Sequence, residues 1–329
     1  MIQFRLPFRQ LAAAIGLGLF AFAASAFAQP AWPAKPIRIV VPFPPGGGTD
    51  FIARIVAERL ATATGATTLV DNKPGAGGNI GLDAVAKSSA DGYTLGMGQT
   101  ANLAINPHLY SKMPYDALKD FTPVGSVASQ PMVLVVTTRS ALRSVADVVA
   151  AAKVAPQRVR IGLAGSGTVG HMAGEMLERR AGVQLLNVPY RGAGPAMTDL
   201  LGGQFDIYFG NAASVLPQIT GGKLRALAVT SANRLPALKD VPTMIEAGYP
   251  GFEAVTWSGL VAPAGTPPAI VARLNAEIDK ILKQPEVLAK LATEGSTATG
   301  GSAAEFGERI RAEHQKWGAL IQGSNIKID

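Results

Sequence analysis

Three glycine-rich segments of the sequence each separate an apolar run from a helical pattern. They are Pro42–Asp50, Asn72–Gly81 and Gly165–Gly170. Where a strand meets a helix, the first helical N–H groups lack intrahelical partners and lie at the positive end of the helix dipole. Such a place binds an anion without needing a charged side chain, and glycine lets the backbone approach the ligand closely. The chemistry that these segments favour is therefore anion binding.

Each of the first two segments also has a purely structural interpretation. Pro42–Asp50 could be a plain turn before a helix N-cap at Thr49 or Asp50, although three consecutive glycines and three prolines are more than a turn needs. Asn72–Gly81 is equally compatible with a loop that only shapes the domain, with Asn79 as a helix cap. Ligand binding is thus favoured for the first segment and left open for the second.

The third segment literally matches the G-x-G-x-x-G pattern and lies between a strand at Val159–Leu163 and a helix. A dinucleotide site would also need an acidic residue about 20 positions further on, to bind the ribose. The next strand ends in Leu186–Pro189 and supplies no acid there. The segment therefore indicates an anion-binding helix start, and no NAD or FAD cofactor is expected.

Further polar side chains follow other predicted strands. Thr100 and Asn102 come after the third strand of the chain, and Phe209-Gly210-Asn211 occupies an equivalent place later on. Tyr190 can stack or donate a hydrogen bond, and Arg191 either pairs with a carboxylate or lies on the surface. In open α/β sheets the ligand crevice lies at the carboxyl ends of the strands, where these residues are predicted to gather.

Enzyme and metal signatures are weak. Ser166 lacks the G-x-S-x-G frame, because Ala164 and Thr168 stand at its two glycine positions. The three histidines are far apart and form no H-x-x-x-H pair, so no metal site is expected. His171 falls in the first turn of a helix, where it either lines the crevice or is a solvated or capping histidine. An enzyme that uses His171 with Ser166 or Asp206 remains an alternative, resting only on their expected proximity to one crevice.

Composition narrows the class further. The 329 residues are 48% hydrophobic and 16% charged and include no cysteine, so disorder, disulfides, Cys-ligated metals and a lipid anchor at cysteine are excluded. Arg5 and Arg9 precede an apolar run, Leu11–Ala24, and an A-x-A pattern at 26–28. This predicts a signal peptide over residues 1–28, cleaved near Ala28, because the run is short of the ~20 residues of a spanning helix.

The mature protein should therefore be free outside the cytoplasm, in the periplasm if the host is Gram-negative. Loss of the two leader arginines lowers the formal net charge from +7 to +5. The remaining basic residues are scattered, and the closest pairs, Arg158/Arg160 and Arg179/Arg180, have no aromatic residue between them, so no nucleic-acid partner is expected.

Strands and helices alternate in two successive units, which predicts parallel sheets covered by helices. In the first unit, strands are expected at Ile37–Val41, Thr67–Val70 and Tyr93–Met97, with helices from Asp50 and around Leu82–Lys87. In the second, strands are expected at Pro131–Val136, Val159–Leu163, Leu185–Val188, Phe205–Phe209 and Leu224–Thr230, with helices at Val145–Lys153, Val169–Arg180, Pro195–Leu201 and Val215–Ile219.

The rest of the chain looks extended at Ala254–Val261 and then helical at Ala269–Leu282, Glu286–Ala292 and Ala303–Ile321. We expect this part to return to the first unit. The predicted domains are therefore residues 29–129 plus 255–329, and an inserted domain over residues 130–254.

Motifs along the whole mature chain resemble the Bug family of extracytoplasmic solute receptors, which are associated with tripartite tricarboxylate transporters. The residues that carry the resemblance are Trp32–Phe43 (WPAKPIRIVVPF), Gly46–Asp50 (GGGTD), Asp71–Asn79 (DNKPGAGGN), Asp91–Leu95 (DGYTL), Gly165–Thr168 (GSGT), His171, Pro189–Gly192 (PYRG), Gly202–Asp206 (GGQFD), Asp240–Thr243 (DVPT) and Ala262–Pro267 (APAGTP).

The resemblance implies a type II periplasmic-binding-protein fold, in which two doubly wound α/β domains enclose a ligand cleft. It implies that the loops at Phe43–Asp50 and Gly165–Thr168 hold a carboxylate, largely through backbone N–H groups and water. Arg191 stands where many relatives carry Lys or Arg. No catalytic residue, metal or cofactor is implied.

The predicted function is a monomeric periplasmic solute-binding protein that captures a small organic carboxylate and delivers it to membrane subunits of a tripartite tricarboxylate-type transporter. Alternatives are a ligand-sensing receptor subunit and a secreted enzyme that acts on a carboxylated substrate. The predicted ligand-binding residues are Phe43, Pro44, Gly46, Gly47, Gly48, Thr49, Asp50, Thr100, Asn102, Gly165, Ser166, Gly167, Thr168, His171, Tyr190 and Asp206.

Overall fold

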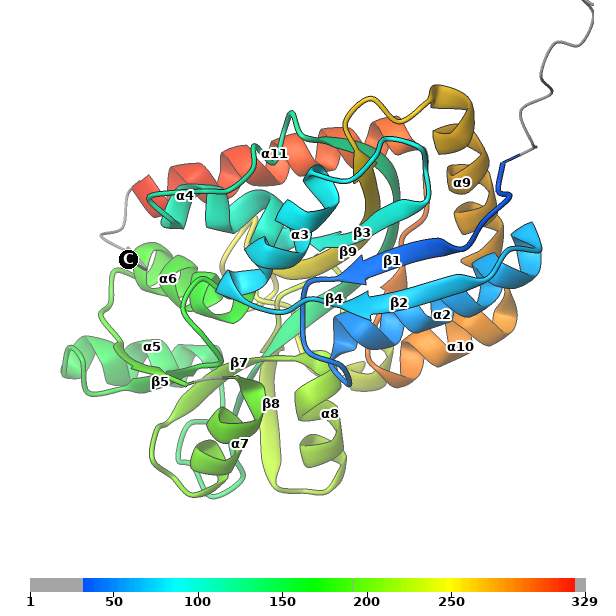
Figure 1. Cartoon of the computed structure of the whole chain (residues 1–329). Coiled ribbons are helices and arrows are strands. Elements are labelled where there is room, and N and C mark those ends of the chain that lie inside the picture. The colour runs from blue at the N-terminus through cyan, green and yellow to red at the C-terminus, as the bar shows by residue number, and fades with distance from the viewer. Residues whose placement is uncertain (1–31, 191, 323–329) are drawn as a thin grey trace, which may run out of the picture.

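The computed structural model describes residues 32–190 and 192–322, so the predicted signal peptide and Arg191 lie outside the described residues. Its strands fall into two groups, each flanked by helices (Figure 1). A continuous path of paired strands connects the groups in the order β2-β1-β3-β9-β4-β7-β5-β6, with β10 and β8 pairing to β4. This is a mixed α/β fold of two units.

The first group confirms the expected alternation of strands and helices. Its strands are β1 (Ile37–Val41), β2 (Thr68–Asn72) and β3 (Thr94–Gln99), and β1 pairs in parallel with both others. Helices α2 (Gly48–Thr64) and α3 (Asn79–Ala86), with a 3-10 turn at Ala76–Gly78, lie between them in sequence. The predicted strands are confirmed, and α3 begins three residues before its expected start.

The second group contains β5 (Arg160–Leu163), β6 (Leu186–Pro189), β7 (Ile207–Asn211) and β8 (Leu224–Val229). Strand β5 is parallel to β6 and β7, as the alternation predicts. Its helices are α5 (Val145–Val154), α6 (Val169–Ala181), α7 (Ala193–Leu201) and α8 (Ala212–Thr220), and a 3-10 turn follows at Pro236–Leu238.

Two long strands join the groups. Strand β4 (Phe121–Thr137) pairs antiparallel with β9 (Val255–Pro263) as far as Pro131, and from Met132 onward it pairs with β7 and β8. The predicted strand at Pro131–Val136 was therefore too short. In its first half, Pro123, Gly125 and two irregularities in register interrupt the alternation of apolar and polar residues, so that half shows no clear strand pattern.

The C-terminal part consists of α9 (Pro268–Ile281), α10 (Pro285–Thr293), β10 (Thr297–Ala298) and α11 (Ala303–Gln322). Leu274 and Ile278 of α9 share a buried core with Ile39 of β1 and Ile52 of α2. A π-helical turn at Ala101–Ile105 and the short α4 (Asn106–Leu109) were not predicted, because four- or five-residue helices show no period.

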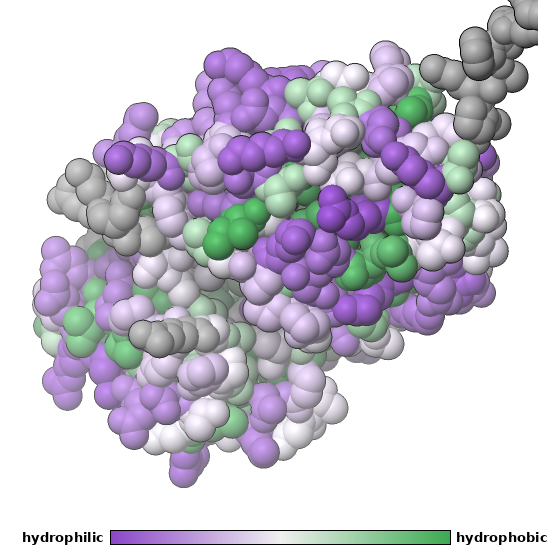
Figure 2. Space-filling model, in the orientation of Figure 1, coloured by the Kyte–Doolittle hydropathy of each residue, from purple (hydrophilic) through white to green (hydrophobic). Residues whose placement is uncertain are grey.

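The surface of the face in Figure 2 is largely hydrophilic, with small separate hydrophobic areas. Within residues 32–190 and 192–322, no helix has both the length and the apolar character needed to cross a bilayer.

Candidate functional site: a cavity between the two strand groups

A cavity of about 290 Å³ lies between the two strand groups. The described residues that line it are Phe43, Gly48, Thr49, Gln99, Ala101, Gln130, Met132, Ala164, Thr168, Val169, Gly170, Ala193, Tyr208, Phe209, Asn211 and Thr256. Helices α2, α6, α7 and α8 begin at or beside these residues, and β1, β3, β5 and β7 end near them. The cavity thus occupies the carboxyl edge of both strand groups, where α/β folds bind ligands.

The electrostatic field in this cavity comes from the backbone. None of the residues that the structure describes in its lining carries a charged side chain. Gly48 and Thr49 belong to the first turn of α2, and Val169 and Gly170 to the first turn of α6. Because first-turn N–H groups lack intrahelical acceptors and helix N-termini are positive, the two strand groups each offer an anion-binding backbone to one small space.

The glycine loop before α2 is held by Asp50, which is only 3% exposed. Its Oδ2 accepts hydrogen bonds from the Gly46 N–H and from Arg54 Nε, both at 2.9 Å. Its Oδ1 accepts one from Asn72 Nδ2, also at 2.9 Å. Asp50 therefore folds the loop that presents Gly48 and Thr49, and does not itself line the cavity.

These contacts make Asp50 sensitive to acid. Burial alone would raise the pKa of the Asp50 carboxyl, but hydrogen bonds from Arg54, Gly46 and Asn72, together with the Arg54 charge, hold this pKa below its usual value. A carboxyl with a lowered folded-state pKa stabilises the fold above its unfolded pKa of about 3.9. That stabilisation is lost as the pH falls through the folded pKa.

Asp50→Asn is therefore expected to lower the free energy of unfolding by about 2 kcal/mol at pH 7, because a buried charged hydrogen-bond acceptor is lost. The difference from the unmodified protein should be constant at higher pH and shrink as the pH falls below about 4, because the folded-state pKa of Asp50 lies below the unfolded one. Urea unfolding at several pH values measures it. Asp91→Asn is the control, since Asp91 also pairs with a cation, Lys35, but is 41% exposed at its side chain and should have little effect. A pH-independent difference for Asp50→Asn would contradict the assignment.

The loop before α6 is closed by Thr168 and His171. Thr168 Oγ1 accepts a hydrogen bond from the His171 N–H at 3.3 Å and donates one to the Gly165 carbonyl at 2.9 Å. His171 Nδ1 accepts a hydrogen bond from the Gly167 N–H at 3.1 Å, and its Nε2 lies 3.6 Å from Glu175. Gly167 has φ +76°, a conformation that favours glycine. Thr168 lines the cavity, whereas His171 is turned toward its own loop.

Several other predicted residues make contacts that fix the backbone around the site. Thr100 Oγ1 donates to the Val255 carbonyl at 3.1 Å and accepts from the Trp257 N–H at 2.9 Å, which joins the end of β3 to β9. Asn102 Oδ1 accepts from the Gln99 N–H at 2.9 Å. Neither Thr100 nor Asn102 is in the cavity lining, and their contacts fix the backbone beside the lining residues Gln99 and Ala101.

Tyr190 and Asp206 are not brought to the cavity. The Tyr190 hydroxyl donates to Asp199 Oδ2 at 2.8 Å. Asp206 precedes β7 and pairs with Arg160 at 2.9 Å, so it lies at the amino end of a strand whose carboxyl end forms the cavity. Asp206 lies at the amino end of β7. Ligands of α/β folds bind at the carboxyl ends of the strands, so Asp206 is at the wrong end to contact a ligand in this cavity.

Of the sixteen predicted residues, the structure places Phe43, Gly48, Thr49 and Thr168 in the cavity lining. Pro44, Gly46, Gly47 and Ser166 are exposed in the adjoining loops. Gly165 and Gly167 are not in the lining, although Thr168 beside them is. Gly48 is the glycine of the first loop that the structure places in the cavity lining, and ligand binding through the backbone of these loops stays a prediction.

Sequence reasoning missed a polar network in the cavity wall. Gln130 Nε2 donates to Ser296 Oγ at 2.6 Å, and Gln130 Oε1 accepts from Asn211 Nδ2 at 3.0 Å. Gln99 Nε2 donates to Thr49 Oγ1 at 3.0 Å. Asn211 was anticipated, because Phe209-Gly210-Asn211 stands at a predicted strand end where the ligand crevice was expected. Gln130 had no such signal, because its part of β4 was not recognised as a strand.

The residues of the enzyme alternative are not assembled. Ser166 is exposed, His171 bonds its own loop, and Asp206 pairs with Arg160 at the far end of β7. Among the described residues, no group of three histidine, aspartate or glutamate side chains is arranged to hold a metal ion.

A cavity between two α/β units that two long strands connect defines the class of periplasmic solute-binding proteins. The family model described as "Tripartite tricarboxylate transporter family receptor" matches residues 52–326. The chain belongs to this family, and its function is that of a solute-binding receptor for a tripartite transporter. The resemblance inferred from the motifs is confirmed.

Relatives agree over nearly the whole chain. Protein BugT of Bordetella pertussis is 39% identical over 298 residues, which cover 90% of this chain and 91% of BugT. Among solved structures, R. palustris Rpa4515 with adipate has a TM-score of 0.82 and 37% identity, covering 90% of this chain and 99% of that one. MatC from Rhodopseudomonas palustris with bound malate has a TM-score of 0.78 and 31% identity, covering 88% and 100%.

Proposed function

We propose that this receptor binds a small organic carboxylate in the cavity between its strand groups and delivers it to membrane subunits of a tripartite tricarboxylate-type transporter. The observation that carries the proposal is that α2 and α6 both begin at one cavity whose described lining residues are all uncharged. Two positive helix ends with free N–H groups suit a carboxylate better than a neutral or cationic solute. The adipate and malate bound by the related proteins Rpa4515 and MatC support the same ligand class.

The size of the cavity favours a small ligand. Its volume of about 290 Å³ lies at the lower end of the ~300–1,000 Å³ typical of small-molecule sites. Backbone groups and neutral side chains make up its described lining, so specificity among carboxylates depends on the length and polarity of the ligand body. Gln99, Asn211 and Thr256 are among the polar side chains that could contact that body.

We also propose that the domains are residues 29–129 plus 255–329 and residues 130–254. The change of β4 partners between Pro131 and Met132, and the start of β9 at Val255, support these boundaries. Rotation at these two crossings would open and close the cavity, as in other hinged binding proteins.

The proposed location is the periplasm, after removal of residues 1–28. The leader pattern and the periplasmic binding protein BugD, 34% identical to this chain, support it. We propose that the protein acts as a monomer and without catalysis. The enzyme alternative would need Ser166, His171 and Asp206 close together, and the structure does not bring them together.

A thermal-shift screen tests the ligand class. Succinate, adipate, citrate and benzoate, each over a concentration series, are compared with their uncharged amides. A ligand at 100 times its dissociation constant stabilises the folded state by about 2.7 kcal/mol. For a protein of this size, that raises the melting temperature by about 5–10 °C. At least one carboxylate should do so while its amide does not. If amides stabilise the protein as well as acids do, or no acid stabilises it, carboxylate binding is wrong.

A further inference from the structure

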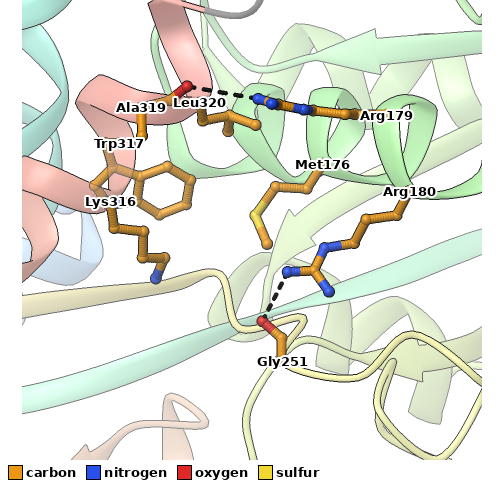
Figure 3. Close-up of a pocket in the computed structure, with 8 residues that line it drawn as sticks. All are labelled: Met176, Arg179, Arg180, Gly251, Lys316, Trp317, Ala319 and Leu320. Atoms are coloured by element: carbon orange, nitrogen blue, oxygen red, sulfur yellow. Dashed lines mark hydrogen bonds between the residues drawn. The ribbon is translucent and has the colours of Figure 1, made fainter.

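A second hollow lies at the opposite end of α6. It has a volume of about 530 Å³ and is lined by Met176, Arg179, Arg180, Gly251, Lys316, Trp317, Ala319 and Leu320 (Figure 3). Its walls are the last turns of α6, the last turns of α11 and the loop before β9. We call it the α6–α11 groove. It shares no lining residue with the ligand cavity.

Two arginines in this groove have no carboxylate partner among residues 32–190 and 192–322. Arg179 Nη1 donates to the Ala319 carbonyl at 3.5 Å, and Arg180 donates to the carbonyls of Pro250 and Gly251. Neither guanidinium pairs with an acidic side chain in the part of the chain that the structure describes. Lys316, in contrast, does pair with a carboxylate. Its Nζ lies 2.8 Å from Oε1 of Glu313, and this carboxylate neutralises the Lys316 charge. Within the described residues, the groove therefore keeps two positive charges that no carboxylate neutralises.

The floor of the groove is apolar. Met176 and Trp317 belong to the buried core, and Leu320 packs against that core while remaining partly exposed. Figure 3 shows the Met176 side chain pointing into the space between Trp317 and Arg180. Arginine, methionine and aromatic residues are enriched at protein–protein interfaces, and guanidinium groups bind carboxylates bidentately. A complementary surface would combine acidic groups with an apolar side chain.

We propose that the α6–α11 groove docks an acidic polypeptide segment of a membrane partner, with carboxylates on Arg179 and Arg180 and an apolar side chain over Met176 and Leu320. This rests on the proposed function, which requires such a partner. Helix α6 has 13 residues and so runs about 20 Å from the ligand cavity to the groove. Because α11 packs with the other strand group, domain rotation changes the groove, and a segment bound there can distinguish the closed receptor from the open one.

The probe for this site is the synthetic peptide fluorescein-Glu-Leu-Asp-Phe-Glu-amide, which carries the label on its N-terminal amine in place of an acetyl group. The peptide fluorescein-Gln-Leu-Asn-Phe-Gln-amide is the comparison without acidic side chains. Fluorescence anisotropy with the full mature protein measures binding. The double variant Arg179→Gln/Arg180→Gln should weaken acidic-peptide binding at least about tenfold. The matched control Arg139→Gln/Arg158→Gln removes two positive charges elsewhere on the inserted unit and should change the affinity less than about twofold.

A second measurement separates this inference from the proposed function. Calorimetry should show that the Arg179→Gln/Arg180→Gln protein binds carboxylate as the unmodified protein does, while uptake of that carboxylate by cells falls about tenfold. If the unmodified protein binds no carboxylate, the proposed function fails, but the peptide result still tests the groove.

Four results would overturn the proposal. The two double variants could lose peptide affinity equally, which would indicate only general charge attraction. Free succinate at low millimolar concentration could displace the peptide, which would make the groove a small-anion site. A chain ending at Gln322 could bind the peptide tenfold more tightly, which would identify residues 323–329 as the occupant. Finally, uptake could remain unchanged in the Arg179→Gln/Arg180→Gln strain.

Discussion

Gly48→Val is expected to weaken carboxylate binding at least about 100-fold, the largest loss we expect from a single substitution. Gly48 lines the ligand cavity, and a Cβ atom placed there would lie 3.2 Å from both Nε2 and Oε1 of Gln130. Gln130 cannot move away easily, because the same two atoms hold Ser296 and Asn211. The valine side chain therefore occupies the space in front of the first α2 amides, which an anion must approach. Isothermal calorimetry with the best carboxylate from the thermal screen measures the loss.

The neighbouring glycine provides the matched control. Gly47 has an ordinary extended conformation, and a Cβ atom there would have only the Pro44 carbonyl within reach, at 3.7 Å. Gly47→Ala should therefore change the affinity by less than about twofold. Circular dichroism and melting temperature would establish that both proteins fold. Equal loss from both substitutions would mean that flexibility of the whole glycine loop, and not access to the cavity, governs binding.

Gly170→Ala is expected to lower the free energy of unfolding by about 2 kcal/mol and to weaken carboxylate binding about tenfold. A Cβ atom on Gly170 would lie 2.5 Å from the backbone oxygen of Phe209, which is too close for any contact without movement. Phe209 belongs to β7 and is paired there with Leu134 of β4, so the sheet resists and the start of α6 must shift. Overpacking of this kind typically costs about 1–3 kcal/mol. The first-turn amides of α6 move with it.

The predicted loss of stability on Gly170→Ala is opposite in sign to what helix propensity predicts. Helix propensity alone would predict that alanine in place of a helical glycine stabilises the protein by about 0.5–1 kcal/mol. Gly194→Ala in the first turn of α7 is the control, because a Cβ atom there has nothing within 4 Å. It should be neutral or stabilising. Urea unfolding of both variants measures the difference, and stabilisation by Gly170→Ala would show that α6 does not pack against β7 as described.

Local sequence patterns were sufficient for most elements of the fold. Helix periodicity and short β-branched runs depend on neighbouring residues, so Ile37–Val41, α6 and the C-terminal helices could be predicted with only small errors at their ends. The strand–glycine–helix order likewise identified the loops before α2 and α6 as anion-binding candidates. The family motifs added the periplasmic class and the ligand type to be tested.

The first half of β4 could not be found in this way. Its strand character comes from pairing with β9, which follows more than a hundred residues later, and not from its own alternation. Gln130 was missed for the same reason. It became part of the cavity wall only because β4 passes between the two strand groups and brings it to Ser296 and Asn211.

The sequence by itself determined that this is an α/β receptor whose glycine loops start helices and can bind an anion, because those features depend on residues close together in the chain. The tertiary structure decided which polar groups line the cavity. Thr168 and Asn211 face the cavity, whereas Asp50 and Asp206 are each taken up by an arginine partner. A buried or half-buried polar group must be paired with whatever lies beside it, and only long-range packing determines whether that neighbour is a ligand or another part of the protein.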